Sequence, residues 1–253
     1  MKKTLVPIVA LLLAASAAAQ PKIIAHRGYW QTSGSAQNSL ASLVKADSIG
    51  CYGSEFDVWL TADDRLIVNH DRVYRDTDIR MDESRASLIT AIVLPNGERI
   101  PTLDAYLATA ERCPSIRLIL EIKSLSDPKR EALCAKKIVR TLKRHGVLDR
   151  TDFIAFSFDA CLAVRALLPE ARVYYLNGDL APKRIAEANL TGIDYWEGVL
   201  REHPEWIAQA HELGLEVNVW TVNDEESMRH FIARGVDYIT TDRPEQLRQL
   251  LER

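Results

Sequence analysis

The sequence lacks an excess of basic residues. Lys and Arg number 32 against 35 Asp and Glu, which gives a formal net charge of −3 in 253 residues. Proteins that bind nucleic acid through its phosphates usually carry a basic surface, whereas the basic residues here are scattered. Their longest local cluster, within residues 136–144, has the spacing of a solvated helix face. We therefore expect no nucleic-acid partner.

The sequence also has few cysteines and no clustered ones. Cys51, Cys113, Cys134 and Cys161 are separated by 62, 21 and 27 positions, so no C-x-x-C metal pattern occurs. Each cysteine lies in or near an apolar helical stretch. Two disulfides would be permitted in an oxidising compartment, but free, buried cysteines are the favoured interpretation.

Long hydrophobic runs are absent apart from one at the N-terminus. Lys2 and Lys3 precede an apolar run over residues 5–13, and small residues follow up to Ala19. This pattern predicts a secretory signal peptide over residues 1–20. The run is shorter than the roughly 20 residues that span a bilayer, so no transmembrane anchor is expected after processing. We expect a periplasmic or secreted protein whose mature part, residues 21–253, is one domain.

Apolar runs of strand length alternate with segments of helical spacing along the mature chain. This rhythm predicts a parallel sheet closed into a TIM-type (β/α)8 barrel, with an open doubly wound sheet as the alternative. Helices opening at Pro204, Asn223 and Asp242 complete the pattern, the last two with those polar residues as caps. The nine expected strands are 23–25, 55–60, 66–69, 116–122, 153–156, 173–176, 192–195, 215–222 and 236–240.

Nine strand candidates exceed the eight positions of such a barrel. No helix fits between the strands at 55–60 and 66–69, and residues 72–98 are polar and irregular, with one short helical stretch over 84–91. The barrel is therefore expected to be irregular around its second and third strands, with an elaborated loop that leaves little room for a separate capping domain.

Polar residues gather at the ends of the early strands. The first strand ends in His26-Arg27-Gly28, and the alternation in the second puts Glu55 and Asp57 on one face. Because parallel strands release their carboxyl ends at one edge, these side chains should meet. The complete set is His26, Arg27, Glu55, Asp57, His70, Glu121 and Lys123.

Each of these residues alone also admits a structural interpretation. His26 could be a core histidine, Glu55 or Glu121 could pair with a neighbouring cation, and Asp71 could be a cap or turn residue. Buried charges cost several kcal/mol unless they are paired or bound to a ligand. Seven such groups at neighbouring strand ends favour a functional site.

The set contains what phosphodiester cleavage requires. Three carboxylates suit Ca²⁺ or Mg²⁺ better than zinc, and such an ion polarises a bound phosphate. Arg27 can bind phosphate oxygens in a bidentate manner, and Lys123 can stabilise the negative charge that grows in the transition state. Two histidines can divide the roles of general acid and general base.

In its ordered motifs the chain resembles the glycerophosphodiester phosphodiesterase family, within the phosphatidylinositol-phospholipase-C-like barrels. The resemblance covers essentially the whole mature chain. The matching motifs are His26-Arg27-Gly28, Glu55-x-Asp57-Val58, Leu60-Thr61-x-Asp63, Val68-x-His70-Asp71, Ile100-Pro101-Thr102-Leu103, Glu121-Ile122-Lys123, Ser157-Phe158, Trp220-Thr221-Val222-Asn223 and Ile239-Thr240-Thr241-Asp242-x-Pro244.

The resemblance implies a barrel enzyme that hydrolyses glycerophosphodiesters to glycerol 3-phosphate and an alcohol, often through a cyclic phosphate. It implies one divalent cation, Ca²⁺ or Mg²⁺, and a small-molecule glycerophosphodiester substrate. Trp220 is expected to line the pocket, with barrel packing as the alternative. The implied roles are a metal at Glu55, Asp57 and Glu121, acid and base at His26 and His70, and phosphate contacts from Arg27 and Lys123.

One position departs from the family pattern. The family usually has Pro-Glu-Asn-Thr after the His-Arg-Gly loop, whereas this chain has Ala36-Gln37-Asn38-Ser39. Gln37 keeps hydrogen bonding but removes a charge near Arg27, which can change substrate preference. Two alternative functions are a phospholipase or lyase acting on intact lipids and a periplasmic protein that binds phosphate esters without turnover.

Overall fold

The computed structural model describes residues 20–75 and 77–252. The expected signal peptide, residues 1–20, lies outside these residues apart from Gln20. Within the described part of the chain, no helix is both long enough and apolar enough to span a membrane.

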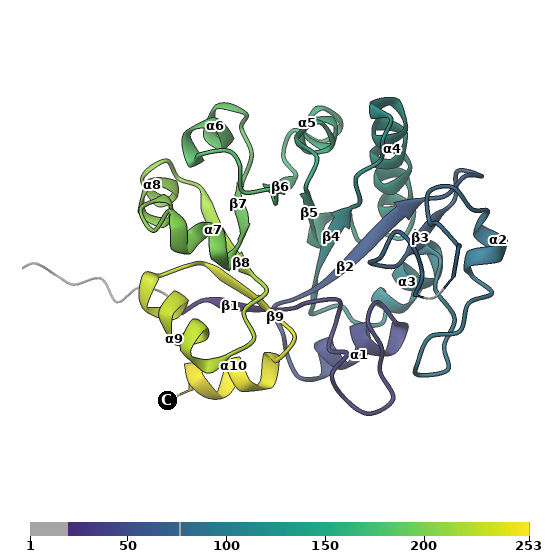
Figure 1. The fold of residues 1–253 in the computed structure, drawn as a ribbon, viewed down its shortest axis with the longest axis horizontal. Coiled ribbons are helices and arrows are strands. Elements are labelled where there is room, and N and C mark those ends of the chain that lie inside the picture. The colour runs from purple at the N-terminus through teal and green to yellow at the C-terminus, as the bar shows by residue number, and fades with distance from the viewer. Residues whose placement is uncertain (1–19, 76, 253) are drawn as a thin grey trace, which may run out of the picture.

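Eight parallel strands close into a barrel (Figure 1). The strand order is β1-β9-β8-β7-β6-β5-β4-β2, and β2 pairs again with β1 to complete the circle. The TIM-type barrel is therefore confirmed and the open sheet is excluded. The barrel strands are β1 (Lys22–Ala25), β2 (Gly53–Leu60), β4 (Arg117–Ile122), β5 (Thr151–Ala155), β6 (Arg172–Tyr175), β7 (Gly192–Trp196), β8 (Glu216–Trp220) and β9 (Tyr238–Thr241).

The ninth strand, β3 (Leu66–Val68), lies outside the closed circle. It runs antiparallel to β2, with Val58 opposite Val68, after a tight turn in which Asp64 has a φ of 55°. Antiparallel neighbours need no crossover helix, so β3 can follow β2 directly. The parallel neighbour of β2 on this side of the barrel is β4. The expected irregularity around the second and third strands is confirmed.

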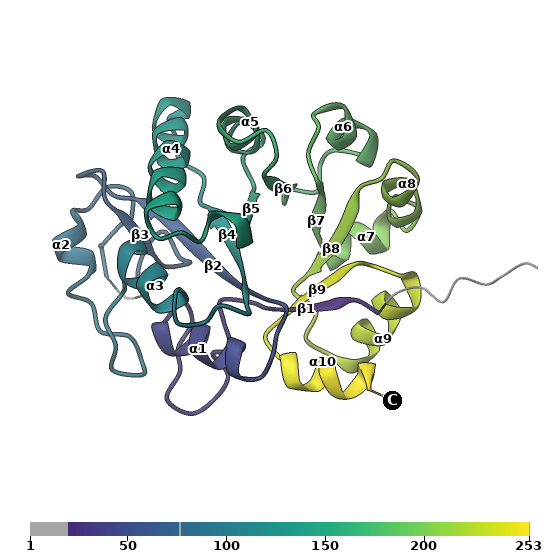
Figure 2. The ribbon, with the colours of Figure 1, turned by 180° about the vertical axis from the view of Figure 1, so that it is seen from behind.

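The segment between β3 and β4 has a small apolar core of its own. In Figures 1 and 2, β3 and α2 (Ala86–Ile89) lie together at one side of the barrel. Trp59 of β2 and Ile67 of β3, which lie opposite each other in the strand pair, are buried with Met81, Ile89 and Ile100 in this separate core. The loop is thus tethered to the barrel by packing, which holds the end of β3 in place.

Helices surround the strands (Figure 1). Several begin at a capping side chain that accepts a backbone N–H: Ser39, Thr102, Asp127, Ser157 and Asp224. The remaining bounds are α1 (Leu40–Ser48), α3 (Leu103–Ala110), α4 (Pro128–Arg144), the 3₁₀ helix Leu148–Arg150, α5 (Phe158–Leu167), α6 (Pro182–Glu187), α7 (Glu197–Glu202), α8 (Trp206–Glu212), α9 (Glu225–Arg234) and α10 (Pro244–Leu251).

The expectations about the last helices need three corrections. The helix expected to open at Pro204 is α8, which begins at Trp206, and a further helix, α7, precedes it that was not expected. Asp224, not Asn223, caps α9, because its Oδ1 accepts from the Ser227 N–H at 2.8 Å. Asp242 does not cap α10; its carboxylate is bound elsewhere, as described below.

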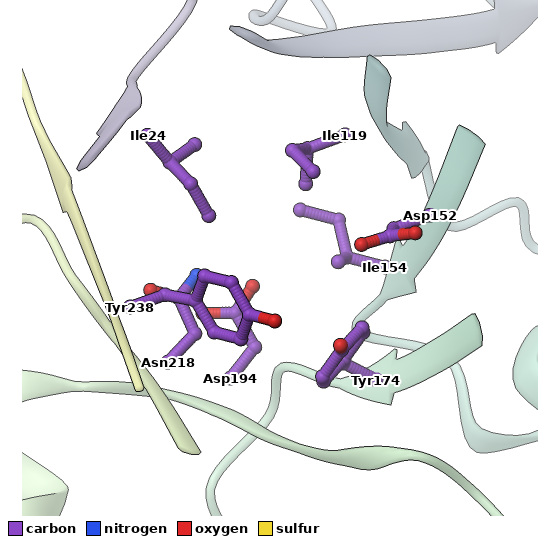
Figure 3. Close-up of a pocket in the computed structure, with 8 residues that line it drawn as sticks. All are labelled: Ile24, Ile119, Asp152, Ile154, Tyr174, Asp194, Asn218 and Tyr238. Atoms are coloured by element: carbon purple, nitrogen blue, oxygen red, sulfur yellow. The ribbon is translucent and has the colours of Figure 1, made fainter. Parts of the chain in front are cut away.

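All four cysteines are free and buried, as expected. The barrel interior itself is filled by side chains from alternate strand positions, among them Ile24, Ile119, Ile154, Tyr174 and Tyr238. They leave a cavity of about 10 Å³ (Figure 3), about the space that one water needs. The interior is therefore closed below the carboxyl ends of the strands, and chemistry is confined to the two ends of the barrel.

Candidate active site

The first strand delivers its histidine and arginine through a strained turn. After β1, Arg27 adopts a φ of 55° and Gly28 a φ of 73°, a region that glycine tolerates best. A Cβ on Gly28 would lie 2.3 Å from Ser42 Oγ, so no other residue fits there. In this turn the Arg27 N–H donates to Glu55 Oε2 at 2.7 Å. The turn thus connects the first strand to the acidic residues of the second.

Glu55, Asp57 and Glu121 converge as the alternation predicted. Ligand oxygens from the three carboxylates all lie within 4.8 Å of one another, and all three residues are buried. Asn38 fixes Asp57 from both sides: its Nδ2 donates to Asp57 Oδ2 at 2.7 Å, and its Oδ1 accepts from the Asp57 N–H at 3.1 Å. The three acids therefore form one preorganised cluster, called here the acidic triad.

The two expected cations lie against this triad. Lys123 Nζ is 2.8 Å from Glu121 Oε1 and 3.2 Å from Asp57 Oδ1. Arg27 Nη1 donates to Gln37 Oε1 at 2.8 Å, which is where the family pattern has an acid. Gln37 therefore positions the guanidinium without neutralising it.

The triad carries more negative charge than its cations offset. Burial, followed by the charges of Asp57 and Glu121, holds the pKa of Glu55 well above its usual range. Burial raises the pKa of Glu121 to about 8. Burial opposes the ionisation of Asp57, but the positive charges of Lys123, His70 and Arg27 keep its pKa low. Burial likewise opposes the charge of Lys123, but Asp57 and Glu121 raise its pKa.

The donor set fits a hard divalent cation. Glu55 Oε1 is buried and has no hydrogen-bond partner among the described residues, and such orphaned acceptors are costly. The ligand oxygens belong to carboxylates, which Ca²⁺ and Mg²⁺ prefer. The triad could therefore hold one such ion.

His26 is held by a carboxylate that the sequence analysis assigned to a helix cap. Its Nδ1 lies 2.8 Å from Asp242 Oδ1, an oxygen that also accepts from Trp30 Nε1 at 2.9 Å. Asn223 Nδ2 donates to the other oxygen at 2.7 Å. Although burial opposes it, these hydrogen bonds hold the pKa of Asp242 below its usual range. An ionised Asp242 fixes the ring and leaves Nε2 for chemistry.

His70 has a similar partner. It follows β3, and its Nδ1 lies 2.7 Å from Asp71 Oδ1. Burial lowers the pKa of His70, and nearby cations lower it further against the opposing charge of Asp57. The extra strand β3 thus delivers a second carboxylate-paired histidine to the same end of the barrel.

These groups border one pocket of about 270 Å³. One half carries the charged residues, among them His26, Arg27 and His70. The other side is largely apolar, although Asp194, Thr221 and Thr240 also line it. On this side Trp220 meets Phe156 edge to face at 5.6 Å between ring centroids. Trp220 Nε1 donates to the Asp194 carbonyl at 2.9 Å, so the ring position is fixed. The expected place of Trp220 as a pocket wall agrees with this geometry.

Four functional candidates were missed or misassigned by the sequence analysis. Asp242 and Asn223 looked like caps because Pro244 and a helical pattern follow them. Asp71 looked like a turn residue, although its position next to His70 could have suggested an orienting role. Asp194 follows Gly192 by two positions in a buried strand, and this alternation would have placed it inside the barrel.

Comparisons with known proteins identify a family. A family model described as the glycerophosphoryl diester phosphodiesterase family matches residues 26–246. A glycerophosphodiester phosphodiesterase of Caldanaerobacter subterraneus subsp. tengcongensis is 28% identical over 250 residues, covering 91% of this chain and 98% of that protein.

Solved structures give the same result. The crystal structure of a glycerophosphodiester phosphodiesterase from Parabacteroides distasonis is 45% identical, with a TM-score of 0.90, and the match covers 92% of this chain and 97% of that one. An Oleispira antarctica phosphodiesterase, solved with its product sn-glycerol-3-phosphate, shares the fold at 24% identity and a TM-score of 0.78, over 92% of this chain and 98% of that one.

Proposed function

The chain belongs to the glycerophosphoryl diester phosphodiesterase family and is a phosphoric diester hydrolase, and from this premise we propose its specific reaction and site. It hydrolyses glycerophosphodiesters to glycerol 3-phosphate and an alcohol in a metal-dependent reaction. The observation that carries the proposal is that two carboxylate-paired histidines, His26 and His70, border the same pocket as Glu55 and Glu121.

Substrate binding rests on the cations. Arg27 binds phosphate oxygens through its guanidinium, which Gln37 orients without cancelling its charge. Lys123 supplies a fixed positive charge where negative charge grows on the phosphate. Glu55, Asp57 and Glu121 would hold one Ca²⁺ or Mg²⁺ ion, which when bound polarises the phosphate.

The histidines move the protons. Because Asp242 and Asp71 occupy the Nδ1 atoms, each ring exchanges its proton at Nε2. One histidine takes the proton of the attacking glycerol hydroxyl, and the other protonates the oxygen of the departing alcohol. Water then opens the cyclic phosphate with the two roles reversed, which restores both histidines and yields glycerol 3-phosphate.

The proposal is tested by glycerol 3-phosphate release from glycerophosphocholine, -ethanolamine, -glycerol and -inositol. Release should stop in EDTA and return with Ca²⁺ or Mg²⁺, and His26→Ala should lower kcat by about a hundredfold to ten-thousandfold. His145→Ala is the matched control, because His145 also contacts two carboxylates, Glu111 and Asp104, but lies outside the pocket. Undiminished release of glycerol 3-phosphate in EDTA, or by the His26→Ala variant, would contradict the proposal.

The same experiment separates the alternatives. Turnover of intact phospholipid micelles in preference to soluble diesters would indicate a phospholipase or lyase that uses this pocket. Calorimetric binding of the diesters with no product formed would indicate a binding protein.

Export is the remaining part of the proposal. The Lys2-Lys3 pair, the apolar run and the small residues before Gln20 support a cleaved signal peptide and a periplasmic or secreted enzyme. Fractionation of cells that express the full chain, with N-terminal sequencing of the product, tests it. An uncleaved chain in the cytoplasmic fraction would contradict it.

A further inference from the structure

Asp194 is a buried carboxyl group for which the proposed mechanism has no use. It is 2% exposed, lies on β7 and borders both the active-site pocket and the small cavity beneath it (Figure 3). Its Oδ1 has no hydrogen-bond partner among the described residues. Leaving a buried acceptor unpaired costs free energy, so the group needs an explanation.

The surroundings of Asp194 offer no compensating charge in the described structure. The other residues on this side of the pocket are uncharged. They are apolar, as are Ile154, Phe156 and Leu176, or carry a hydroxyl, as do Thr221 and Thr240. The amide of Asn218, on the next strand, donates to Thr240 Oγ1 at 2.8 Å. Burial raises the pKa of Asp194 to about 7, although the neighbouring Asn218 side chain lowers it. Because no described residue donates to Oδ1, a ligand or a water can supply that hydrogen bond.

The pocket geometry indicates which part of a ligand lies there. A phosphodiester has two ester arms, and two cavities meet at His70: the pocket of about 270 Å³ and a neighbouring one of about 380 Å³ that Trp30 and Tyr74 also line. A phosphate held by Arg27 beside the acidic triad sends one arm into each cavity. In the first, the arm passes Trp220 and ends near Asp194.

Resting on the proposed function, we propose that Asp194 is a specificity residue for this arm, and that its Oδ1 accepts a hydrogen bond from a substrate hydroxyl. The aromatic faces of Trp220 and Phe156 cover the carbon atoms of a small polyol, while the carboxyl at the end of the pocket pairs with its hydroxyl. The hydroxyl belongs either to the glycerol unit or to the leaving alcohol, and the choice of substrates separates these two sources.

The test compares Asp194→Leu and Asp194→Asn on three diesters. Glycerophosphocholine has hydroxyls only on glycerol, and glycerophosphoglycerol has them on both arms. Bis(4-nitrophenyl) phosphate has none, so water must attack its phosphorus directly in place of a glycerol hydroxyl, with 4-nitrophenolate as the leaving group. Asp194→Leu should lower kcat/KM for a hydroxyl-bearing diester about tenfold to a hundredfold. Asp194→Asn, which keeps an acceptor, should lose less. Both variants should hydrolyse bis(4-nitrophenyl) phosphate at the wild-type rate.

The pattern of losses identifies the arm. Equal losses on both glycerophosphodiesters place glycerol at Asp194, and a loss on glycerophosphoglycerol alone places the leaving alcohol there. The inference is overturned if kcat/KM falls equally on all three diesters or on none of them. It is also overturned if kcat/KM falls on glycerophosphocholine alone, because that would mean recognition of the choline cation. Wild-type protein that cleaves only bis(4-nitrophenyl) phosphate would instead contradict the proposed function, and the inference with it.

Thermal denaturation provides a second readout. Since Oδ1 is buried and unpaired, Asp194→Leu should raise Tm while it lowers kcat/KM on the hydroxyl-bearing diesters. Glu216→Gln is the matched control: this inward acid at the other end of the barrel is paired with Arg172 and two tyrosines. It should lower Tm and leave the ratio of the rates unchanged. A lower Tm in Asp194→Leu would contradict an unpaired carboxyl.

Discussion

The barrel has a cluster of buried or half-buried charges at each end, and the two clusters differ in how completely they are paired. At the amino ends of the strands, Asp152 lies 2.5 Å from Arg117 Nη2 and 3.3 Å from Arg172 Nε. Arg172 also pairs with Glu216, which accepts from the hydroxyls of Tyr174 and Tyr238 at 2.5 and 3.0 Å. Two acids meet two arginines, and these hydrogen bonds close the network.

The carboxyl ends of the strands carry the opposite arrangement. Lys123 pairs with Asp57 and Glu121, and the Arg27 N–H donates to Glu55 Oε2. Glu55 Oε1 has no partner among the described residues. Hydrogen bonds from Tyr174 and Arg172 lower the pKa of Glu216 against the effect of burial, whereas burial and neighbouring acids raise the pKa of Glu55. Breaking a complete pair destabilises a fold because it leaves one charge uncompensated. Incomplete pairing marks a place where a ligand supplies the missing charge.

The largest effect on activity is expected from a substitution in the incompletely paired cluster at the carboxyl ends. Glu55→Gln should lower kcat/KM about a thousandfold, because a ligand carboxylate worth several kcal/mol to the transition state is lost. In EDTA the same variant should be more stable than wild type, since it removes a buried carboxyl group whose ionisation the fold opposes. Steady-state kinetics and calorimetric Tm values with and without Ca²⁺ check both parts. A Glu55→Gln variant with a lower Tm than wild type in EDTA would mean that the carboxyl-end cluster is as completely paired as the amino-end cluster.

The paired cluster should respond in the opposite way. Asp152→Asn leaves Arg117 and Arg172 without their shared acceptor, and we expect a loss of about 3 kcal/mol in the free energy of unfolding. Because this end lies outside the pocket, kcat/KM should stay within about twofold of wild type. Urea denaturation gives the stability, and the glycerol 3-phosphate assay gives the activity. A large fall in kcat/KM in Asp152→Asn protein that is still folded would contradict the claim that the amino-end cluster has no part in catalysis.

A third change sharpens the role of the carboxylates around the site. Asp242→Asn should lower kcat about tenfold to a hundredfold and leave KM little changed, because an amide no longer fixes the Nδ1 proton of His26. The pH profile of kcat should shift along with the rate. An unchanged profile would reduce Asp242 to a packing role. Asp224→Ala, which removes the capping side chain of α9, is the control for local structure.

The pH dependence of stability should differ with and without metal. The pKa of Glu121 is raised from an ordinary 4.5 to about 8, so between these values the folded protein binds more protons than the unfolded chain. Stability in EDTA should therefore fall as pH rises from about 4.5 to about 8, by at least about 1 kcal/mol relative to Glu121→Gln. Saturating Ca²⁺ should abolish this fall. Parallel curves for both proteins in EDTA would contradict the assignment.

The smallest effect concerns Gln37. Gln37→Glu would place a carboxylate on Arg27 Nη1, now bound to Gln37 Oε1 at 2.8 Å, and an exposed or half-buried ion pair contributes under about 1 kcal/mol. We expect KM to rise about threefold with kcat unchanged, because part of the charge that binds phosphate is neutralised. A KM that falls would show that the acid supports substrate binding.

The hydrophobic periodicity of the sequence and the order of its motifs predicted most of this fold. The alternation in Glu55-Phe56-Asp57 and in Glu121-Ile122-Lys123 placed the triad and its lysine correctly, because a strand offers a side chain only two faces. The surplus strand at 66–69 was also found, since no helical pattern separates it from its neighbour. These features are local, and local sequence determines them.

The partners of the histidines could not be predicted in the same way. Asp242 is 216 positions from His26, and the two meet only because β9 closes the barrel beside β1. Locally, Asp242 precedes a proline that begins a helix, which is also the setting of a cap. Asp194 was missed for a related reason: an acid within a buried strand becomes unusual only when its surroundings are known to hold no partner for Oδ1.

The most direct test of the central claim is glycerol 3-phosphate release by EDTA-treated protein during titration with Ca²⁺ or Mg²⁺. If the cluster at the carboxyl ends is short of positive charge because it holds one cation beside a phosphate, release should rise from the background and saturate at one ion per chain. Full release before any ion is added would contradict that claim.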